Sequence, residues 1–298
     1  MKKFFIAILA LAASLLPAAD LLNFCPNGAD GALKIDMAKI LQHPKLAAML
    51  SEKKLSSLMD SGSDFAVKQL RGCRSLLIFY LADSDLAGLL LDSSALQDIP
   101  ATLALGEQKF TSRKFAGRDG FVVEDEKHNR TALIQLTDEV MLAVSEDDAE
   151  KVLSLPSGNA AKLRKLIASL PAQDTPVWLV GEMPCPAEDG VAIQLFKLYA
   201  TFEYSDSGTE YTTSAVLDCP DENSAEQIKM LVDLVVSGGV GAAFAEDPKL
   251  GKAILKKLKI SAKKRQVKGK FVVNDELLTR ITRYVEEHPE AFSSLSGE

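Results

Sequence analysis

The spacing of apolar and polar positions changes along the chain, and each change predicts an element. After a short strand in DGALKID, apolar side chains recur at helical spacing through residues 37–60, with an interruption at Pro44. Two apolar runs in SLLIFYLADSDLAGLLLD then predict paired strands with a buried face. Four more strands are expected in EQKFTSRKFAG, GFVVED, RTALIQL and EVMLAV, joined by polar loops. A helix over about residues 159–170 ends this half of the chain.

The second half repeats the change between strand and helix patterns. It opens with the strand VWLVGEM and the hairpin YATFEY–SDSG–TEYTTSAVL. A helix with Ile228, Leu231 and Val235 at helical spacing follows, and Asp247-Pro248 begins another. A strand near KGKFVV and a helix over about 276–287 complete it. Because the two prolines of PAQDTP indicate a boundary, we expect an N-terminal domain at 20–171 and a C-terminal domain at 172–298.

This order of elements predicts the α+β class. We expect antiparallel sheets with helices packed on one face, in two halves of similar size.

Residues 1–19 have the pattern of a signal peptide. Lys2 and Lys3 precede an apolar run over 4–16, and Pro17-Ala18-Ala19 ends it. The run is shorter than the roughly 20 apolar residues of a membrane-spanning helix. An uncleaved anchor is the alternative, because proline is a poor residue three places before the cleavage site. We therefore expect an exported protein, periplasmic or extracellular, whose mature chain begins near Asp20.

Charge and composition narrow the function classes. The 298-residue chain carries a net charge of −7, which becomes −9 when the two lysines of the leader are removed. A mildly acidic surface argues against general nucleic-acid binding, which needs a basic face. An apolar fraction of 47% and a charged fraction of 25% are typical of a globular protein, and no further membrane span is expected.

Four cysteines permit two disulfides in an oxidising compartment, with three connectivities. The pairing we favour is Cys25–Cys73 and Cys185–Cys219, one bridge in each half. The alternative is that some of them are buried free thiols, because cysteine packs well as a small apolar residue. No pair has the spacing of a redox motif or of a zinc knuckle.

Catalytic, metal and cofactor motifs are not found in the sequence. The three histidines, His43, His128 and His288, have no metal-ligand spacing, although His128 lies near Glu124 and Asp125. There is no complete phosphate-binding loop and no nucleophile elbow. We expect no catalytic residue, no metal and no cofactor, while a hydrolase whose site is assembled from distant residues stays an alternative.

One segment reverses the charge of the chain. No acidic residue occurs between Pro248 and Asn274, and cations are dense there. The candidate anion-facing residues are Lys256, Lys257, Lys259, Lys263, Lys264, Arg265, Lys268 and Lys270. Such a patch suits an anionic lipid, an acidic polysaccharide or an acidic protein surface. Charge runs are more commonly solvated, here as a helix face followed by an edge strand whose lysines prevent strand-to-strand aggregation. Val267, Phe271 and Val273 alternate with Lys268 and Lys270, which predicts a strand with one buried and one wet face.

The order of elements resembles that of uncharacterised exported bacterial proteins. The opening ALKIDMAKILQHPKLAAML and the meander KFAGRDGFVVEDEKHNRTALIQLTDEVMLAVSEDDAEKVL carry this resemblance, which covers most of the mature chain and implies no activity. The leading hypothesis is therefore an exported, soluble, non-catalytic binding or interaction protein. A periplasmic carrier of an apolar or amphipathic ligand is the first alternative. The carrier would show a large apolar cavity, whereas an interaction protein would show an exposed apolar or single-sign patch.

Overall fold

The computed structural model describes residues 20–49, 73–93, 109–124, 128–171, 174–184, 195–205 and 207–288. The expected signal peptide lies outside these ranges. The chain forms two compact units. Unit 1 comprises Met1–Gly28 and Asp36–Ala160, and unit 2 comprises Ala29–Ile35 and Ala161–Glu298.

The division between the units differs from the expected boundary at residue 171. Helix α8 (Ala161–Ile167) belongs to unit 2, and so does the early segment Ala29–Ile35. This segment forms strand β1 (Gly31–Asp36), which pairs antiparallel with β8 (Val177–Pro184). Its backbone groups therefore find their partners far along the chain, which a boundary drawn from local composition cannot show.

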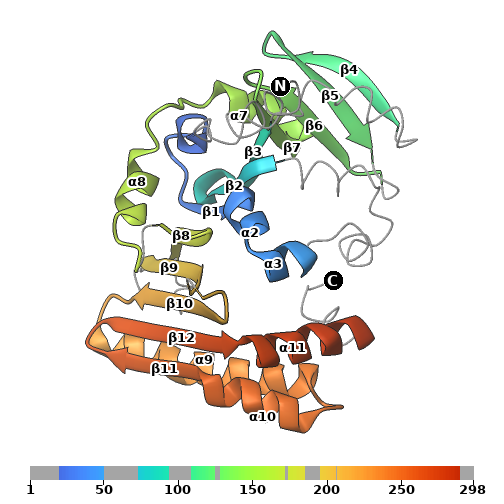
Figure 1. Ribbon diagram of the computed structural model, residues 1–298. Coiled ribbons are helices and arrows are strands. Elements are labelled where there is room, and N and C mark those ends of the chain that lie inside the picture. The colour runs from blue at the N-terminus through green and yellow to red at the C-terminus, as the bar shows by residue number, and fades with distance from the viewer. Residues whose placement is uncertain are drawn as a thin grey trace. The chain divides into compact units, whose positions relative to one another are not determined.

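Unit 1 contains a six-stranded antiparallel sheet among its described residues. The strands are β2 (Cys73–Leu81), β3 (Leu86–Ser93), β4 (Phe110–Phe115), β5 (Arg118–Glu124), β6 (Arg130–Gln135) and β7 (Val140–Ser145). Their order in the sheet is β2-β3-β7-β6-β5-β4, so the meander joins the first hairpin through its last strand (Figure 1). The paired strands and the four-strand meander expected from the sequence are confirmed.

Short helices accompany this sheet. They are the 3-10 turns η1 (Leu21–Asn23), η2 (Ala82–Ser84) and η4 (Glu146–Asp148), and the α-helices α2 (Met37–Gln42), α3 (Pro44–Met49) and α7 (Ala149–Ser154). The predicted helix over 37–60 is broken before Pro44 as expected, because proline has no N–H to donate and restricts the residue before it. The rest of that predicted helix lies outside the described residues.

The core of unit 1 lies on the inward faces of alternating strand positions. Leu77, Phe79, Leu90 and Ile134 are almost completely buried. A buried ion pair lies at the end of the β2–β3 hairpin, where Arg74 Nε donates to Asp92 Oδ1 at 3.0 Å. Arg74 Nη2 also donates to Glu139 at 2.7 Å, so the guanidinium links this hairpin to the turn before β7.

Unit 2 contains six antiparallel strands among its described residues. In sheet order its strands are β1, β8, β9 (Leu195–Tyr204), β10 (Glu210–Asp218), β12 (Gln266–Asn274) and β11 (Leu258–Lys263). Its helices are α8, α9 (Glu222–Ala243), α10 (Pro248–Lys257) and α11 (Asp275–Glu287). The predicted β9–β10 hairpin is confirmed, as is the start of α10 at Asp247-Pro248, where Asp247 caps the N–H of Leu250.

The helices of unit 2 cover different faces of its sheet. Ala225 and Ile228 of α9 pack with Cys219, Val267, Leu217 and Ile260, which places α9 on the face that carries these side chains. Lys162 of α8 instead pairs with Glu182 at 2.8 Å. Because neighbouring strands in register share faces, Glu182 lies on the opposite face from Leu217. The predicted antiparallel α+β class is confirmed, and in unit 2 its helices are divided between the two faces.

Candidate anion-binding surface

Six of the eight candidate cations fall on an antiparallel hairpin, of which the sequence predicted one strand. The alternation on β12 is confirmed, since Val267 and Val273 are buried while Lys268 and Lys270 are exposed. Strand β11, which we did not expect, pairs with β12 over its whole length. The register sets Lys259 directly opposite Lys270, and Ser261 opposite Lys268.

These pairs place four lysines on one face of the sheet. Residues opposite each other in register point the same way, so Lys259, Lys263, Lys268 and Lys270 share the face turned away from α9. We call these four side chains the lysine face. All four are exposed, because α8 packs against β8 on this side, whereas α9 packs under β11 and β12 on the other. Figure 1 shows α9 behind these two strands.

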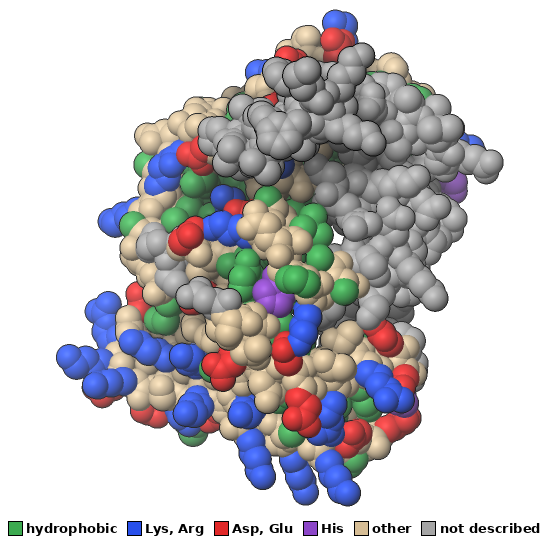
Figure 2. Space-filling model, viewed as in Figure 1, with side chains coloured by type: hydrophobic (Ala, Val, Ile, Leu, Met, Phe, Trp, Pro, Cys, Tyr) green, Lys and Arg blue, Asp and Glu red, His purple; other side chains and the backbone are tan. Residues whose placement is uncertain are grey.

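The other four candidate residues lie elsewhere. Lys264 and Arg265 form the turn between β11 and β12, whereas Lys256 and Lys257 end helix α10. Figure 2 shows Lys and Arg side chains gathered at the lower left edge of the molecule, where Figure 1 places this turn. The structure therefore separates one run of charge in the sequence into a lysine face, a cationic turn and a helix end.

A groove of about 570 Å3 lies at the turn end of the lysine face. Its lining consists of Asp218, Ser261, Lys263, Lys264, Arg265, Gln266 and Lys268. Two hydrogen bonds hold the turn to the end of β10. The backbone N–H of Cys219 donates to the carbonyl of Arg265 at 2.7 Å, and Gln266 Nε2 donates to Asp218 Oδ1 at 2.6 Å. The sequence reasoning missed Asp218, Ser261 and Gln266, since no local pattern connects them with the lysines.

The lysine face concentrates like charge, with Asp218 as the carboxylate beside it. Cβ atoms directly opposite each other in an antiparallel pair lie about 4.5–5.5 Å apart, and like charges there destabilise the pairing. Lys259 and Lys270 stand in this relation. None of the four lysines forms an ion pair with another described residue, although unit 2 has such pairs elsewhere, as at Lys229 and Asp233.

A second exposed surface lies on α9. Its apolar positions were expected to recur on one helical stripe, and Ile228 does pack on the sheet. Leu231 and Val235, however, are 58% and 62% exposed, and Met230 and Leu234 beside them are 62% and 71% exposed. Exposed apolar patches commonly mark contact surfaces. This one projects from the helix side of the sheet, so it does not merge with the lysine face.

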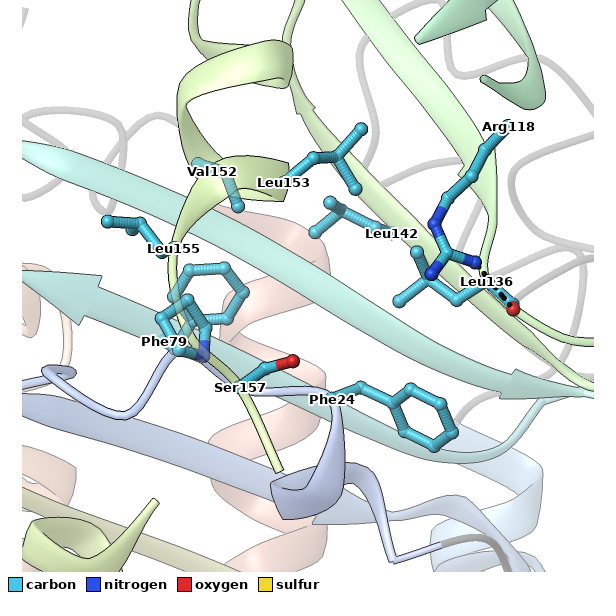
Figure 3. A pocket seen from close by; sticks show the side chains of 10 residues that line it. Phe24, Phe79, Arg118, Leu136, Leu142, Val152, Leu153, Leu155 and Ser157 are labelled. Atoms are coloured by element: carbon cyan, nitrogen blue, oxygen red, sulfur yellow. Dashed lines mark hydrogen bonds between the residues drawn. The ribbon is translucent and has the colours of Figure 1, made fainter. Parts of the chain in front are cut away.

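Unit 1 has a small cavity between its sheet and the chain segments over it (Figure 3). Its volume is about 90 Å3, and its lining includes Phe24, Phe79, Leu142 and Val152. Arg118 reaches its edge, where Nη1 donates to the carbonyl of Leu136 at 3.1 Å. Pockets for drug-sized ligands measure about 300–1,000 Å3. A cavity of this size is too small for a long acyl chain.

Each cysteine that the structure describes is a free, buried thiol. The expected Cys25–Cys73 bridge is therefore not formed in this structure, and Cys219 is also a thiol. Burial raises the pKa of Cys25 to about 12 and that of Cys73 to about 11, so both are protonated and poor nucleophiles for disulfide exchange near neutral pH. Cys185, the expected partner of Cys219, lies outside the described residues.

The three histidines make separate contacts. His128 Nδ1 is 2.7 Å from Glu124, His288 Nδ1 is 3.2 Å from Glu246, and His43 Nδ1 accepts from the N–H of Leu46. Across the described ranges, no group of three or more His, Cys, Asp or Glu side chains is arranged to hold a metal ion. None of the helices described is both long and apolar enough to cross a membrane.

Comparisons with known proteins give a likeness in structure only. No family model matches the chain, and no curated protein matches it. Crystal forms I, III and IV of TP0453, a bacterial protein of Treponema, are similar to it at TM-scores of 0.47, 0.48 and 0.45, with identities of 15%, 12% and 14%. The matches cover 87–90% of this chain and 95–100% of those chains. A likeness at this level says nothing of function.

Proposed function

We propose that this chain is an exported, non-catalytic binding protein that contacts an anionic partner through the lysine face of unit 2. The observation that carries the proposal is the uncovered β10-β12-β11 surface, where four lysines project together with no ion-pair partner among the described residues. A mainly cationic patch on an otherwise acidic chain raises the local concentration of anions and attracts negatively charged surfaces.

The described side chains favour binding over catalysis. The groups with the largest pKa shifts are buried acids held neutral, namely Cys25, Cys73 and Tyr211, whose pKa is raised to about 12 by burial and by its contact with Asp275. A general acid or base needs a pKa near the working pH, in a cleft that admits substrate. The buried thiols and Tyr211 serve packing and hydrogen bonding instead.

The carrier alternative would require a larger cavity. The apolar cavity of unit 1 is well below the usual size of ligand pockets, and the groove of unit 2 is lined mainly by charged and polar side chains. Binding at a surface accounts for both observations, because it needs an exposed complementary face and no enclosed volume.

The test uses two sets of four substitutions with equal charge. One set replaces Lys259, Lys263, Lys268 and Lys270 by Gln. The matched set replaces the exposed lysines of α10, which are Lys249, Lys252, Lys256 and Lys257. Retention on a sulfated polysaccharide column is measured at increasing salt, since exposed charges are screened within about 8–10 Å at physiological ionic strength.

We expect the first set to abolish retention and the α10 set to keep most of it. Equal losses from both sets would show that retention follows net charge alone, and the lysine face would then have no special role. Wild-type protein that passes through the column even at low salt would refute the proposal directly.

A further inference from the structure

The groove at the β11–β12 turn brings together cations from both strands and from the turn between them. Lys263 and Lys268 come from neighbouring strands, since Lys263 is opposite Gln266 and Lys268 is two residues further along β12. Such diagonal positions lie about 7–8 Å apart. Lys264 and Arg265 add two cations from the turn itself, so four positive side chains line one groove of about 570 Å3.

The polar groups between these cations are partly fixed. Asp218 is the carboxylate in the lining, and its Oδ1 accepts a hydrogen bond from the amide of Gln266. Ser261 adds a hydroxyl from the next strand. None of the four cations forms an ion pair with a described residue, so their donors face the groove or solvent.

The first residue of the turn, Lys264, adopts a backbone conformation that is unfavourable for its residue type. Lys264 has φ +54°, in the left-handed region that glycine and asparagine tolerate best. For other L-residues this region costs roughly 1–2 kcal/mol. Two-residue hairpin turns therefore favour Asn-Gly or a glycine pair, whereas this turn reads Lys-Arg. Strain of this kind concentrates at binding sites, where the side chain contributes something that glycine could not.

We propose that this groove binds a phosphate-monoester group, an inference that rests on the proposed function and names the chemistry its surface recognises. A phosphate monoester carries a charge of about −1.5 to −2 at neutral pH and three strong acceptor oxygens. Arg265 can offer a bidentate fork to two of these oxygens, and the lysines offer point charges to the remainder. A phosphodiester or a carboxylate has a single charge and would leave most of the four cations without a partner.

The phosphate monoester is either part of a small free molecule or the headgroup of a lipid. The free probe is methyl phosphate, compared with dimethyl phosphate, its singly charged diester, by NMR titration of the full mature chain. The lipid probe is a vesicle containing phosphatidic acid, compared with a vesicle containing phosphatidylglycerol at the same zeta potential. In each comparison the two probes are chemically similar, and the phosphate group of one carries more negative charge than that of the other.

The variant is the pair Lys264→Asn with Arg265→Gln, because asparagine suits the left-handed backbone and the fold is kept. The control is Lys252→Gln with Lys256→Gln on α10, which removes the same charge away from the groove. A charge-assisted hydrogen bond contributes about 1.5–3 kcal/mol, which corresponds to tenfold or more in affinity. Thermal unfolding of each variant shows that loss of binding is not loss of fold.

We expect wild type and control to bind the monoester probe at least tenfold more tightly than the singly charged probe, and the groove variant to lose this preference. A preference for methyl phosphate alone identifies a free ligand, and a preference on vesicles alone identifies a lipid headgroup. Equal binding of monoester and diester in both comparisons overturns the groove site. If wild type then still binds the sulfated column through the lysine face, the proposed function stands without it.

Discussion

Alkaline pH should destabilise unit 1 by ionising two buried thiols. An acid whose pKa is raised by folding stabilises the native state below its unfolded pKa, and this contribution is lost as pH rises toward the folded pKa. Cys25 and Cys73 ionise near pH 9 when unfolded, but near 12 and 11 when buried in the fold. Their contribution is therefore complete below pH 9 and falls between pH 9 and 12.

The size of the loss follows from these values. At pH 11 an unfolded thiol is two pH units above its pKa, and each unit corresponds to about 1.4 kcal/mol. The native thiol of Cys25 is still protonated there, so it alone should cost about 2–3 kcal/mol of unfolding free energy between pH 8 and pH 11. Cys73 should cost slightly less, because its folded pKa is about 11.

The assay is urea unfolding at pH 8 and pH 11 for wild type, Cys25→Ala and Cys73→Ala under reducing conditions. Other groups also titrate in this range, so the informative quantity is how much less each variant loses than wild type. A difference of about 2 kcal/mol for each variant supports buried thiols. Equal losses in all three proteins, or rapid alkylation of native Cys25 at pH 8, would contradict the reasoning. Without reductant, a Cys25–Cys73 bridge would be revealed by a wild type that loses no more stability between pH 8 and pH 11 than either variant.

Three further substitutions test particular contacts by the same unfolding assay. Gly120→Ala should cost about 1–3 kcal/mol, because the added Cβ would lie 2.8 Å from the carbonyl oxygen of Leu133, and a neutral effect would show that the strands separate easily. Asp92→Ala should cost about 1.5–3 kcal/mol by removing the charge-assisted hydrogen bonds that Arg74 donates to it while Glu139 remains, and a loss below 1 kcal/mol would mean that water replaces the carboxylate. Asp247→Ala should cost about 1 kcal/mol by uncapping α10, whereas an unchanged midpoint would show that Pro248 alone fixes the start of the helix.

The sequence predicted the elements whose signals are local. The β9–β10 hairpin, the meander of unit 1 and the start of α10 follow from alternation, turn residues and a proline at the first helical position. Strand β11 was missed because no glycine or proline separates it from α10, and lysines continue through both. Its identity as a strand depends on pairing with β12, which is a tertiary contact.

The exposed stripe of α9 shows the limit of helical periodicity. Apolar residues at helical spacing predict a buried face, and Ile228 follows that rule. Leu231 and Val235 belong to the same apolar segment but lie on the exposed side of the helix, whereas Val232 and Val236 next to them are partly buried. Periodicity shows that a helix has an apolar face, while the width that is buried depends on the surface beneath it.

The candidate site depends on the register between strands, which the sequence does not contain. A count of charges showed a basic run but not which side chains share a face. The pairing of Lys259 with Lys270 and of Ser261 with Lys268 turns part of that run into a surface, and Asp218 joins the groove from a strand 48 residues earlier than Gln266. The division of helices between the two faces then leaves this surface open. An edge strand needs only a few lysines to prevent aggregation. The four cations that line the groove at the turn are more than this protection requires, which is the reason to look for a bound anion there.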